Sequence, residues 1–369
     1  MDKKMRVLIS GYYGYGNVGD EAVLEAIVGG FLRQDPTLKI TVLSAAPEMT
    51  AHFYKVKAIG RYSWFNFLVE MIKTDVFISG GGTLFQDSSS NRSFWYYIGQ
   101  VLLAKLLFKK VMVFAQGFGP LTGRINRLIA ALALKRLNVI TVRDEESKKK
   151  MSEIGVDPNK ITVTADPTFL LSNPSSVEGR KVLALEGVAT NKPLLGVSVR
   201  GLPKKKGIEL PFYRALAEML DSFAEKNGHQ VVFLLLHCPE DMRETSKVIN
   251  FMSHKSNVIY KICSPQEMLS VISQCDFLIG MRLHALIFAV KSIVPAFGLS
   301  YDPKVKSFMD SVGSPCVTVD ETVDRARLEK LVEAQFAIRD ASKKMLEKVL
   351  IHLREKAEEN FSIFFRTFK

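Results

Sequence analysis

Short runs of β-branched and apolar residues alternate along the chain with longer amphipathic stretches. In the first half, the stretches with helical periodicity include Asp20–Arg33, Ser93–Phe108 and Ile125–Leu137. Strands that are buried on both faces and separated by helices are typical of βαβ units and a parallel sheet. The strands predicted between these helices are Arg6–Ser10, Lys39–Ser44, Asp75–Ser79, Lys110–Ala115, Val139–Val142 and Lys160–Thr164.

Turn-forming residues interrupt this alternation at Ser172–Ser176, and Asn191-Lys192-Pro193 ends the interruption. A second alternating series follows. Its predicted strands are Leu194–Val199, Gln230–Leu236, Asn257–Tyr260, Asp276–Ile279 and Ile293–Phe297, and its predicted helices are Pro211–Asn227, Pro265–Gln274 and Arg282–Val290.

We therefore predict an α/β protein built of two Rossmann-like, doubly wound domains. The N-terminal domain should cover residues 1–172, a linker 173–192, the C-terminal domain 193–323, and a helical tail 324–369. A chain of 369 residues is too long for one ordinary core. Doubly wound sheets bind ligands at the carboxyl ends of their strands, so we expect the two domains to face each other across a cleft.

The charge balance indicates the class of partner. Lys and Arg number 50 against 38 Asp and Glu, a net charge of +12 that favours phosphorylated metabolites or phospholipid surfaces. The chain carries no nucleic-acid-binding motif, so we expect no nucleic-acid partner. The four cysteines lack metal-ligand spacing, so we predict reduced thiols and no metal site.

The two ends of the chain bear on its location. Met1–Arg6 leads directly into the first predicted strand, and no stretch reaches the ~20 apolar residues of a membrane-spanning helix, so we expect a cytoplasmic protein. The last residues, Phe361–Lys369, are apolar with a basic edge. They suit either a terminal helix packed on the domains or a peripheral contact with the inner membrane surface.

Two glycine-bearing loops follow predicted strands in the N-terminal domain. Gly14, Gly16 and Asn17 lie in the first loop. Dinucleotide binding would also require an acidic residue directly after the second strand, but none occurs there before Glu48. A structural tight turn and an anion or sugar contact both remain open for the first loop. Gly81, Gly82 and Thr83 lie in the second loop, where successive glycines allow close approach to a ligand.

Cations and one histidine follow other predicted strands. Arg143 can form a two-pronged contact with a phosphate or carboxylate. Arg282 and His284 open a predicted helix, and Lys304 follows a later strand. Histidine exchanges protons near neutral pH, so His284 is either a catalytic acid or a core residue with satisfied hydrogen bonds. Lys304 is either an anion ligand or a solvated lysine at a helix start.

Together these motifs resemble the polysaccharide pyruvyltransferase family, most closely its bacterial cell-wall branch of the CsaB type. The resemblance runs in order over nearly the whole chain. It is most specific at Arg282-Leu283-His284-Ala285 and Tyr301-Asp302-Pro303-Lys304.

The resemblance implies a fold like that of GT-B glycosyltransferases and phosphoenolpyruvate as the donor substrate, with no further cofactor. It also implies release of phosphate and a cyclic pyruvate ketal on N-acetylmannosamine of a lipid-linked cell-wall precursor, which helps to anchor surface-layer proteins. On this hypothesis His284 is the catalytic acid, and Arg143, Arg282 and Lys304 bind the donor. The acceptor would bind to Gly14, Gly16, Asn17, Gly81, Gly82 and Thr83.

Two other functions fit the predicted fold. A nucleotide-sugar glycosyltransferase or epimerase can share it, since fold alone does not fix function. A non-catalytic binder of membrane-surface glycans would use the basic charge and the aromatic stretches Trp64–Phe67 and Phe94–Tyr97.

Overall fold

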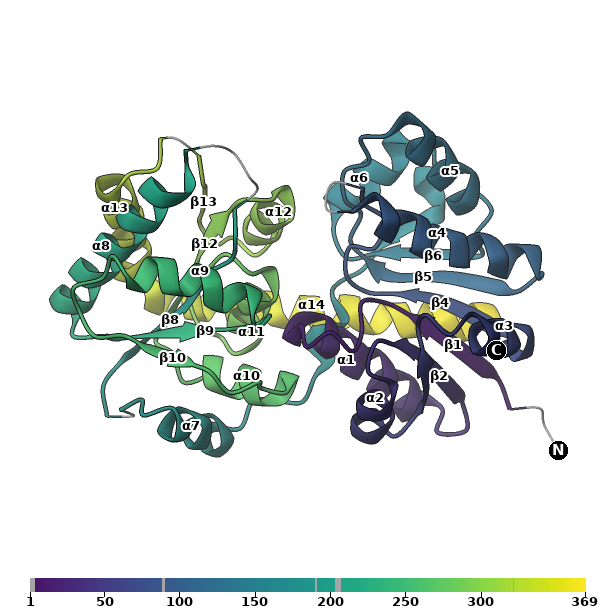
Figure 1. Cartoon of the computed structure of the whole chain (residues 1–369), viewed down its shortest axis with the longest axis horizontal. Helices are drawn as coiled ribbons and strands as arrows, with labels where there is room; N and C mark the ends of the chain where they lie inside the picture. Colours follow the sequence, from purple (N-terminus) through teal and green to yellow (C-terminus); the bar gives the residue numbers. More distant parts are fainter. Residues whose placement is uncertain (1–3, 88–89, 190, 203–206, 321) are drawn as a thin grey trace. The chain divides into compact units, whose positions relative to one another are not determined.

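The computed structural model describes residues 4–87, 90–189, 191–202, 207–320 and 322–369. The chain forms two compact units (Figure 1). Unit 1 consists of Met1–Leu171 and His352–Lys369, and unit 2 consists of Ser172–Ile351. The last helix, α14 (Arg339–Phe368), begins in unit 2 and ends in unit 1.

Unit 1 contains a parallel seven-stranded sheet of order β3-β2-β1-β4-β5-β6-β7. The strands are β1 (Arg6–Ser10), β2 (Lys39–Ser44), β3 (Lys57–Gly60), β4 (Val76–Gly80), β5 (Lys110–Gln116), β6 (Val139–Val142) and β7 (Ile161–Val163). The helices are α1 (Val18–Gln34), α2 (Pro47–Tyr54), α3 (Trp64–Lys73), α4 (Asn91–Leu106), α5 (Arg124–Leu134) and α6 (Glu145–Glu153), with 3-10 turns at Pro158–Lys160 and Pro167–Leu170.

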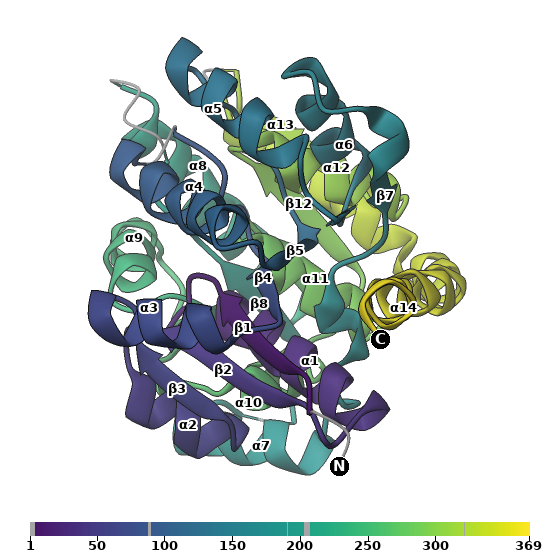
Figure 2. The ribbon, with the colours of Figure 1, turned by 90° about the vertical axis from the view of Figure 1, so that its right-hand side faces the viewer.

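Each face of this sheet carries its own hydrophobic core. Helices α3, α4, α5 and α6 cover one face through side chains such as Phe67, Phe94 and Leu134. Helix α1 and the end of α14 cover the other face, where Phe31 meets Phe361. Figure 2 shows α3, α4 and α5 on one side of the sheet and α1 and α14 on the other. The strands are thus buried on both faces, which explains their nearly continuous apolar sequences.

Unit 2 contains a parallel six-stranded sheet of order β10-β9-β8-β11-β12-β13. The strands are β8 (Leu194–Ser198), β9 (Gln230–Leu234), β10 (Asn257–Ile259), β11 (Phe277–Gly280), β12 (Ala296–Ser300) and β13 (Cys316–Thr318). The helices are α7 (Ser176–Leu185), α8 (Glu209–Asn227), α9 (Glu240–Ile249), α10 (Pro265–Ile272), α11 (Leu283–Lys291), α12 (Pro303–Ser311) and α13 (Arg325–Ala337).

The predicted pair of doubly wound parallel sheets is confirmed. The strand order reverses between β1 and β4 in unit 1 and between β8 and β11 in unit 2. These are the topological switch points at which open α/β sheets bind ligands. The loops after β1, β4, β8 and β11 therefore matter most for function.

Several elements differ from the prediction. The strand predicted at Ile293–Phe297 starts later, at Ala296, because Ile293 adopts a left-handed φ of 58° just after the end of α11. Strand β3 was not predicted, since only Ile59 of its four residues is buried and the sequence shows no apolar run. Elements α2, α3, α7, α9 and β13 were also not predicted.

The segment predicted as a linker, residues 173–192, contains helix α7 within unit 2. Ser175 caps α7 by accepting a hydrogen bond from the Glu178 amide. A Cβ atom at Gly179 would lie 2.2 Å from the Ser270 carbonyl oxygen, so this glycine lets α7 pack closely on α10. The turn residues at both ends of the segment were therefore correctly placed, but the residues between them form a helix that packs within unit 2 and not a linker.

The predicted helical tail, residues 324–369, is divided between the two units. Helix α13 and the start of α14 belong to unit 2, whereas His352–Lys369 belong to unit 1. Among the described residues we find no helix whose length and hydropathy suit a membrane span.

Candidate active site

The loop after β1 is held by the helix that follows it. Gly14 and Gly16 have φ values of +80° and +71°, which glycine adopts without strain. The Gly14 amide donates to the Glu21 carboxylate at 2.6 Å, and Asn17 caps α1 by accepting from the Gly19 amide at 3.1 Å. A Cβ at Gly14 would lie 2.5 Å from the Ala46 nitrogen, so Gly14 has a packing role, whereas Gly16 has open space around it.

The loop after β4 lies beside it, because β1 and β4 pair in the sheet. Gly81 and Gly82 have φ values of +56° and +67°. A Cβ at Gly81 would lie 2.0 Å from a methyl carbon of Val23, so the loop sits directly on α1. The Gly82 carbonyl accepts from the Gly117 amide at 2.8 Å, which ties this loop to the one after β5.

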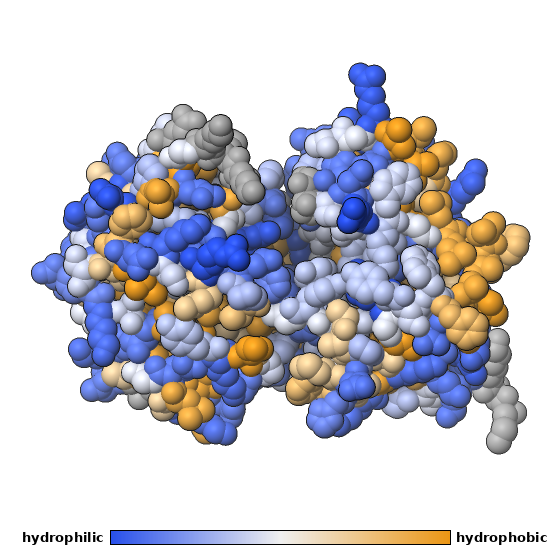
Figure 3. Space-filling view, viewed as in Figure 1, coloured by the Kyte–Doolittle hydropathy of each residue, from blue (hydrophilic) through white to orange (hydrophobic). Residues whose placement is uncertain are grey.

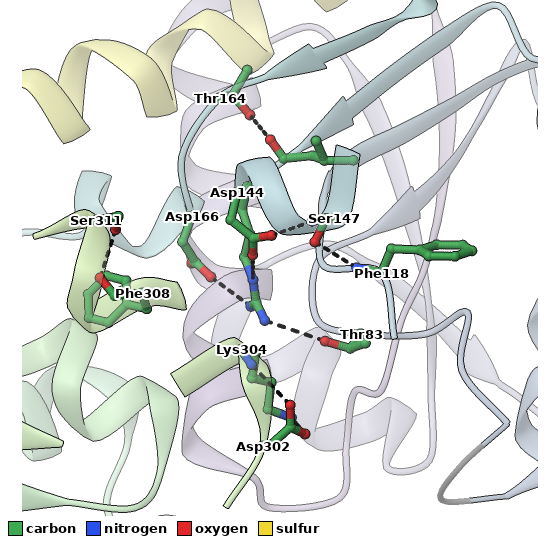
Figure 4. A network of polar contacts seen from close by, with 12 residues as sticks. Thr83, Phe118, Asp144, Ser147, Thr164, Asp166, Asp302, Lys304, Phe308 and Ser311 are labelled. Atoms are coloured by element: carbon green, nitrogen blue, oxygen red, sulfur yellow. Dashed lines mark hydrogen bonds and ion pairs between the residues drawn. The ribbon is translucent and has the colours of Figure 1, made fainter. Parts of the chain in front are cut away.

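Arg143 follows β6, and its side chain is 5% exposed. Its Nη1 donates to Asp166 at 3.1 Å and its Nη2 to the Thr83 hydroxyl at 3.4 Å, while Nε lies 3.5 Å from Asp144 (Figure 4). A Cβ at Gly117 would come within 2.9 Å of Nη2, so this glycine leaves room for the guanidinium. The structure thus brings together the predicted donor ligand Arg143 and the predicted acceptor ligand Thr83.

Helix α6 confirms the interpretation of the acidic run after Arg143 as a helix start. Asp144 is its N-cap and accepts from the Ser147 amide at 2.7 Å (Figure 4). Glu145 and Glu146 occupy the first turn, where carboxylates are favourable.

In unit 2, His284 lies in the first turn of α11, directly after β11, and is partly exposed. Strand β11 lies between β8 and β12 in the sheet. Residues that follow these three strands therefore share one edge of unit 2. Ser198 ends β8 opposite Gly280; its hydroxyl is buried and has no hydrogen-bond partner among the described residues.

Arg282 is 8% exposed and forms an ion pair with Asp241 of α9, which is fully buried. Its Nε lies 2.9 Å from Oδ1 of Asp241 and 3.2 Å from Oδ2, and its Nη2 also donates to Oδ1. Asp241 in turn accepts from the amides of Leu236 and His237 after β9. Arg282 therefore fixes the loop after β9 against α11, and its donor-binding role stays a prediction.

Lys304 lies in the first turn of α12, after β12, and its Nζ is 3.3 Å from Asp302. Burial alone would raise the pKa of Asp302, but Lys304 and Arg200 hold it below its usual value, so the carboxylate is ionised. Arg200 follows β8; its guanidinium hydrogen-bonds to the Tyr301 hydroxyl and lies over the Tyr301 ring. Arg200 thus joins Lys304 and His284 at one sheet edge. Arg200 was not predicted as a site residue, although its position directly after the predicted strand Leu194–Val199 could have indicated it.

No group of three or more histidine, cysteine or acidic side chains is placed to hold a metal ion within the described residues. Burial raises the pKa of Cys263 and Cys275 to about 12, so both remain thiols near neutral pH. The expectations of no metal and no further cofactor stay predictions.

The predicted site residues thus form two sets, one in each unit, and each set includes residues at the switch point of its sheet. In unit 1 they are Gly14, Gly16, Asn17, Gly81, Gly82, Thr83 and Arg143, and in unit 2 they are Arg282, His284 and Lys304. Arg61, a buried arginine after β3 in unit 1, was not predicted from the sequence. Arg61 follows the unpredicted edge strand, so no motif marked it.

Solved structures of low sequence identity share this fold. The UDP-GlcNAc 2-epimerase from Neisseria meningitidis, bound to UDP-GlcNAc, is 12% identical, with a TM-score of 0.66 over 98% of this chain and 100% of that one. A glycosyltransferase from Rickettsia africae is 13% identical, with a TM-score of 0.63 over 100% of this chain and 99% of that one. These likenesses support the predicted GT-B-like, two-domain Rossmann fold.

Sequence comparison is more specific. The amylovoran biosynthesis protein AmsJ from Erwinia amylovora is 22% identical over 371 residues, 86% of this chain and 88% of that protein. The family model for polysaccharide pyruvyl transferase matches residues 17–303, which include Asn17, Arg143, His284 and the start of α12. The chain therefore belongs to the polysaccharide pyruvyl transferase family and is a transferase enzyme.

Proposed function

We propose that the chain transfers pyruvate from phosphoenolpyruvate to a sugar as a cyclic ketal. The observation that carries this proposal is the grouping of an imidazole, His284, with the cations Arg200 and Lys304 at the ends of three adjacent strands. An acid beside fixed positive charges suits a small, highly charged enol ester.

The proposed chemistry starts at the methylene carbon of the donor. His284 donates a proton to this carbon, which becomes a methyl group and leaves C2 electrophilic. One sugar hydroxyl adds to C2 and loses its proton. The C2–O bond to phosphate breaks, and a second hydroxyl adds to C2 and loses its proton. The products are the ketal and inorganic phosphate.

The cations have distinct proposed tasks. Lys304 and Arg282 of unit 2 and Arg143 of unit 1 bind the carboxylate and phosphate of the donor. We add Arg200, whose guanidinium is oriented by Tyr301. The proposal requires the edge that carries Arg143 to face the edge that carries His284 across an interdomain cleft.

For the acceptor we propose N-acetylmannosamine of a lipid-linked cell-wall precursor, as in the CsaB type, with a product that helps to anchor surface-layer proteins. The two glycine loops of unit 1 would bind this sugar. Such an acceptor fits a cytoplasmic enzyme in peripheral contact with the inner membrane surface, with no nucleic-acid partner.

The test is incubation of the protein with phosphoenolpyruvate and a synthetic lipid-linked disaccharide, followed by mass spectrometry and a phosphate assay. We expect one ketal per acceptor and equimolar phosphate. Nucleotide release from UDP-sugars, with no phosphate from phosphoenolpyruvate, would instead identify a glycosyltransferase or epimerase.

A further inference from the structure

Arg61 lies directly after β3 in unit 1 and is 8% exposed. No carboxylate pairs with it among the described residues. Four tyrosine rings surround it instead, with ring centroids 4.5–5.5 Å from its Cζ atom: Tyr15, Tyr62, Tyr96 and Tyr97. A buried arginine with no anion beside it is unusual, because buried charges are ordinarily paired.

The hydrogen bonds of Arg61 are also incomplete. Its Nη2 donates to the Tyr97 hydroxyl at 3.2 Å. In the described part of the chain, Nε and Nη1 are buried and have no partner. Together with Nη2, these groups make up the planar set of N–H donors with which a guanidinium binds phosphate or carboxylate oxygens.

The surroundings of Arg61 place it beside the glycine loop after β1. Tyr15 belongs to this loop, and its ring stacks on Tyr12 at 4.3 Å. The hydroxyls of Tyr15 and Tyr62 are 2.9 Å apart, and Tyr62 is 67% exposed. This pair of tyrosines forms the outer part of the cage, so rotation of the exposed Tyr62 would open the guanidinium to a ligand.

We propose that Arg61 and its tyrosine cage bind the phosphate or diphosphate that joins the acceptor sugar to its carrier. This proposal rests on the proposed function, because it assigns an acceptor subsite beside the glycine loops. An anion would accept from the unpartnered N–H groups that it reaches on Arg61, and the tyrosine hydroxyls could donate to its remaining oxygens. The rings would contact the sugar or the first carrier atoms.

The test measures binding in the absence of phosphoenolpyruvate, so that its outcome does not depend on pyruvyl transfer. The probes are a geranyl-diphosphate-linked disaccharide, the same disaccharide without diphosphate, inorganic diphosphate and UDP-N-acetylglucosamine. The variants are Arg61→Gln and Arg61→Lys, and Arg33→Gln is the control, which removes an exposed charge from the same unit.

We expect Arg61→Gln to weaken binding of the diphosphate probes roughly 10- to 100-fold, with little change for the disaccharide alone. Arg61→Lys keeps the charge and the fold but loses the fork, so it should show a smaller loss. Tighter binding of the geranyl compound than of the UDP-sugar would assign a lipid carrier, and the reverse order a nucleotide carrier. Unchanged affinity in a folded variant, or an equal loss for the disaccharide alone, overturns the proposal.

The outer surface of α3, α4 and α5 carries a second, independent feature, the basic apolar face. Figure 3 shows apolar side chains gathered over these helices. Phe65 of α3 is 79% exposed, and Phe108, just after α4, is 95% exposed. The other exposed apolar side chains of these helices are Trp64, Leu68, Ile72, Trp95, Leu102, Leu106, Ile125, Leu128 and Leu132.

The charges of α4, α5 and the segment between them have one sign, whereas α3 carries Glu70, which pairs with Lys57 and Lys73. Residues 90–138 contain no Asp or Glu but contain eight basic residues: Arg92, Lys105, Lys109, Lys110, Arg124, Arg127, Lys135 and Arg136. Exposed aromatic and aliphatic side chains with basic neighbours match the interface of an anionic bilayer.

We infer that the basic apolar face docks on an anionic phospholipid membrane. This gives a location to the membrane contact of the proposed function, and it does not depend on the donor or the reaction. The docking surface therefore lies on the helices of unit 1 rather than on the apolar end of the chain.

The test is co-sedimentation of the protein with phosphatidylglycerol–phosphatidylcholine vesicles. Trp64→Ser combined with Phe65→Ser should reduce binding more than roughly tenfold, and high salt should weaken the wild-type interaction. Leu210→Ser with Ile262→Ser, two exposed apolar residues of unit 2, should leave binding unchanged. The inference is overturned if the Trp64–Phe65 variant binds vesicles as well as the wild type does. It is also overturned if the wild type binds no vesicles but forms a dimer that the variant loses.

Discussion

The imidazole of His284 is the single side chain to which we assign proton transfer. It lies in the first turn of α11 and is partly exposed, so a glutamine fits there without a cavity. We expect His284→Gln to lower kcat by roughly 10²–10⁴-fold, because general acid catalysis contributes about that much. Phosphate release from phosphoenolpyruvate measures the effect.

The matched control is His352→Gln, which changes an exposed histidine of α14. Thermal unfolding should show nearly equal midpoints for both variants and the wild type. Full activity in the His284 variant would remove the proposed acid.

At the same scale, the sequence indicated which residues lie at strand ends but not what they contact. Arg143 was predicted from its position after a strand, and the structure adds its contacts with Asp166 and Thr83. Arg282 was predicted in the same way, yet its partner, Asp241, lies 41 residues away on α9. Contacts over such separations depend on how the sheet orders its strands, and no local pattern encodes them.

At the scale of elements, the end of α14 is part of the core of unit 1. Phe361 and Phe364 are fully buried and pack edge-on against Phe31 of α1. A Cβ at Gly30 would lie 2.2 Å from the Phe361 ring, so this glycine makes room for it. The sequence left packing and a membrane contact open for this segment, and packing is confirmed for its buried aromatic residues.

We expect Phe361→Ala to lower the free energy of unfolding by about 3–5 kcal/mol, the usual cost of removing a buried phenylalanine. Urea denaturation measures this change. Arg366→Ala on the exposed side of the same helix turn should have little effect. A loss in the Phe361 variant no larger than in the Arg366 variant would show that the tail contributes little to the core.

Polar contacts reinforce this docking. Asn360 accepts hydrogen bonds from Thr141 at 2.6 Å and Thr164 at 2.9 Å and donates to the Ala165 carbonyl. All three partners lie in or just after β6 and β7. The chain end is therefore fixed in register on the sheet, which apolar contacts alone would do less specifically.

At the scale of the whole molecule, both units place their candidate residues by the same kind of sheet topology. Each sheet reverses its strand order once, and the candidate residues follow the strands at that reversal or, for Arg143 and Lys304, strands farther along the same sheet. Much of the net charge of +12 comes from residues 90–138, which contain eight basic residues and no acidic one. A charged donor, a phosphorylated carrier and an anionic membrane are thus consistent with one overall charge balance.

The sequence by itself determined the two parallel sheets, most strand positions and the family, because these follow from local periodicity and from short motifs at strand ends. Only the tertiary structure decided that Arg61 lies in a tyrosine cage, that Arg282 is held by Asp241, and that the aromatic chain end packs on α1. The physical reason is that the partners of a side chain depend on which strands and helices become neighbours. These neighbours are set by the topology of the whole folded chain and not by local sequence.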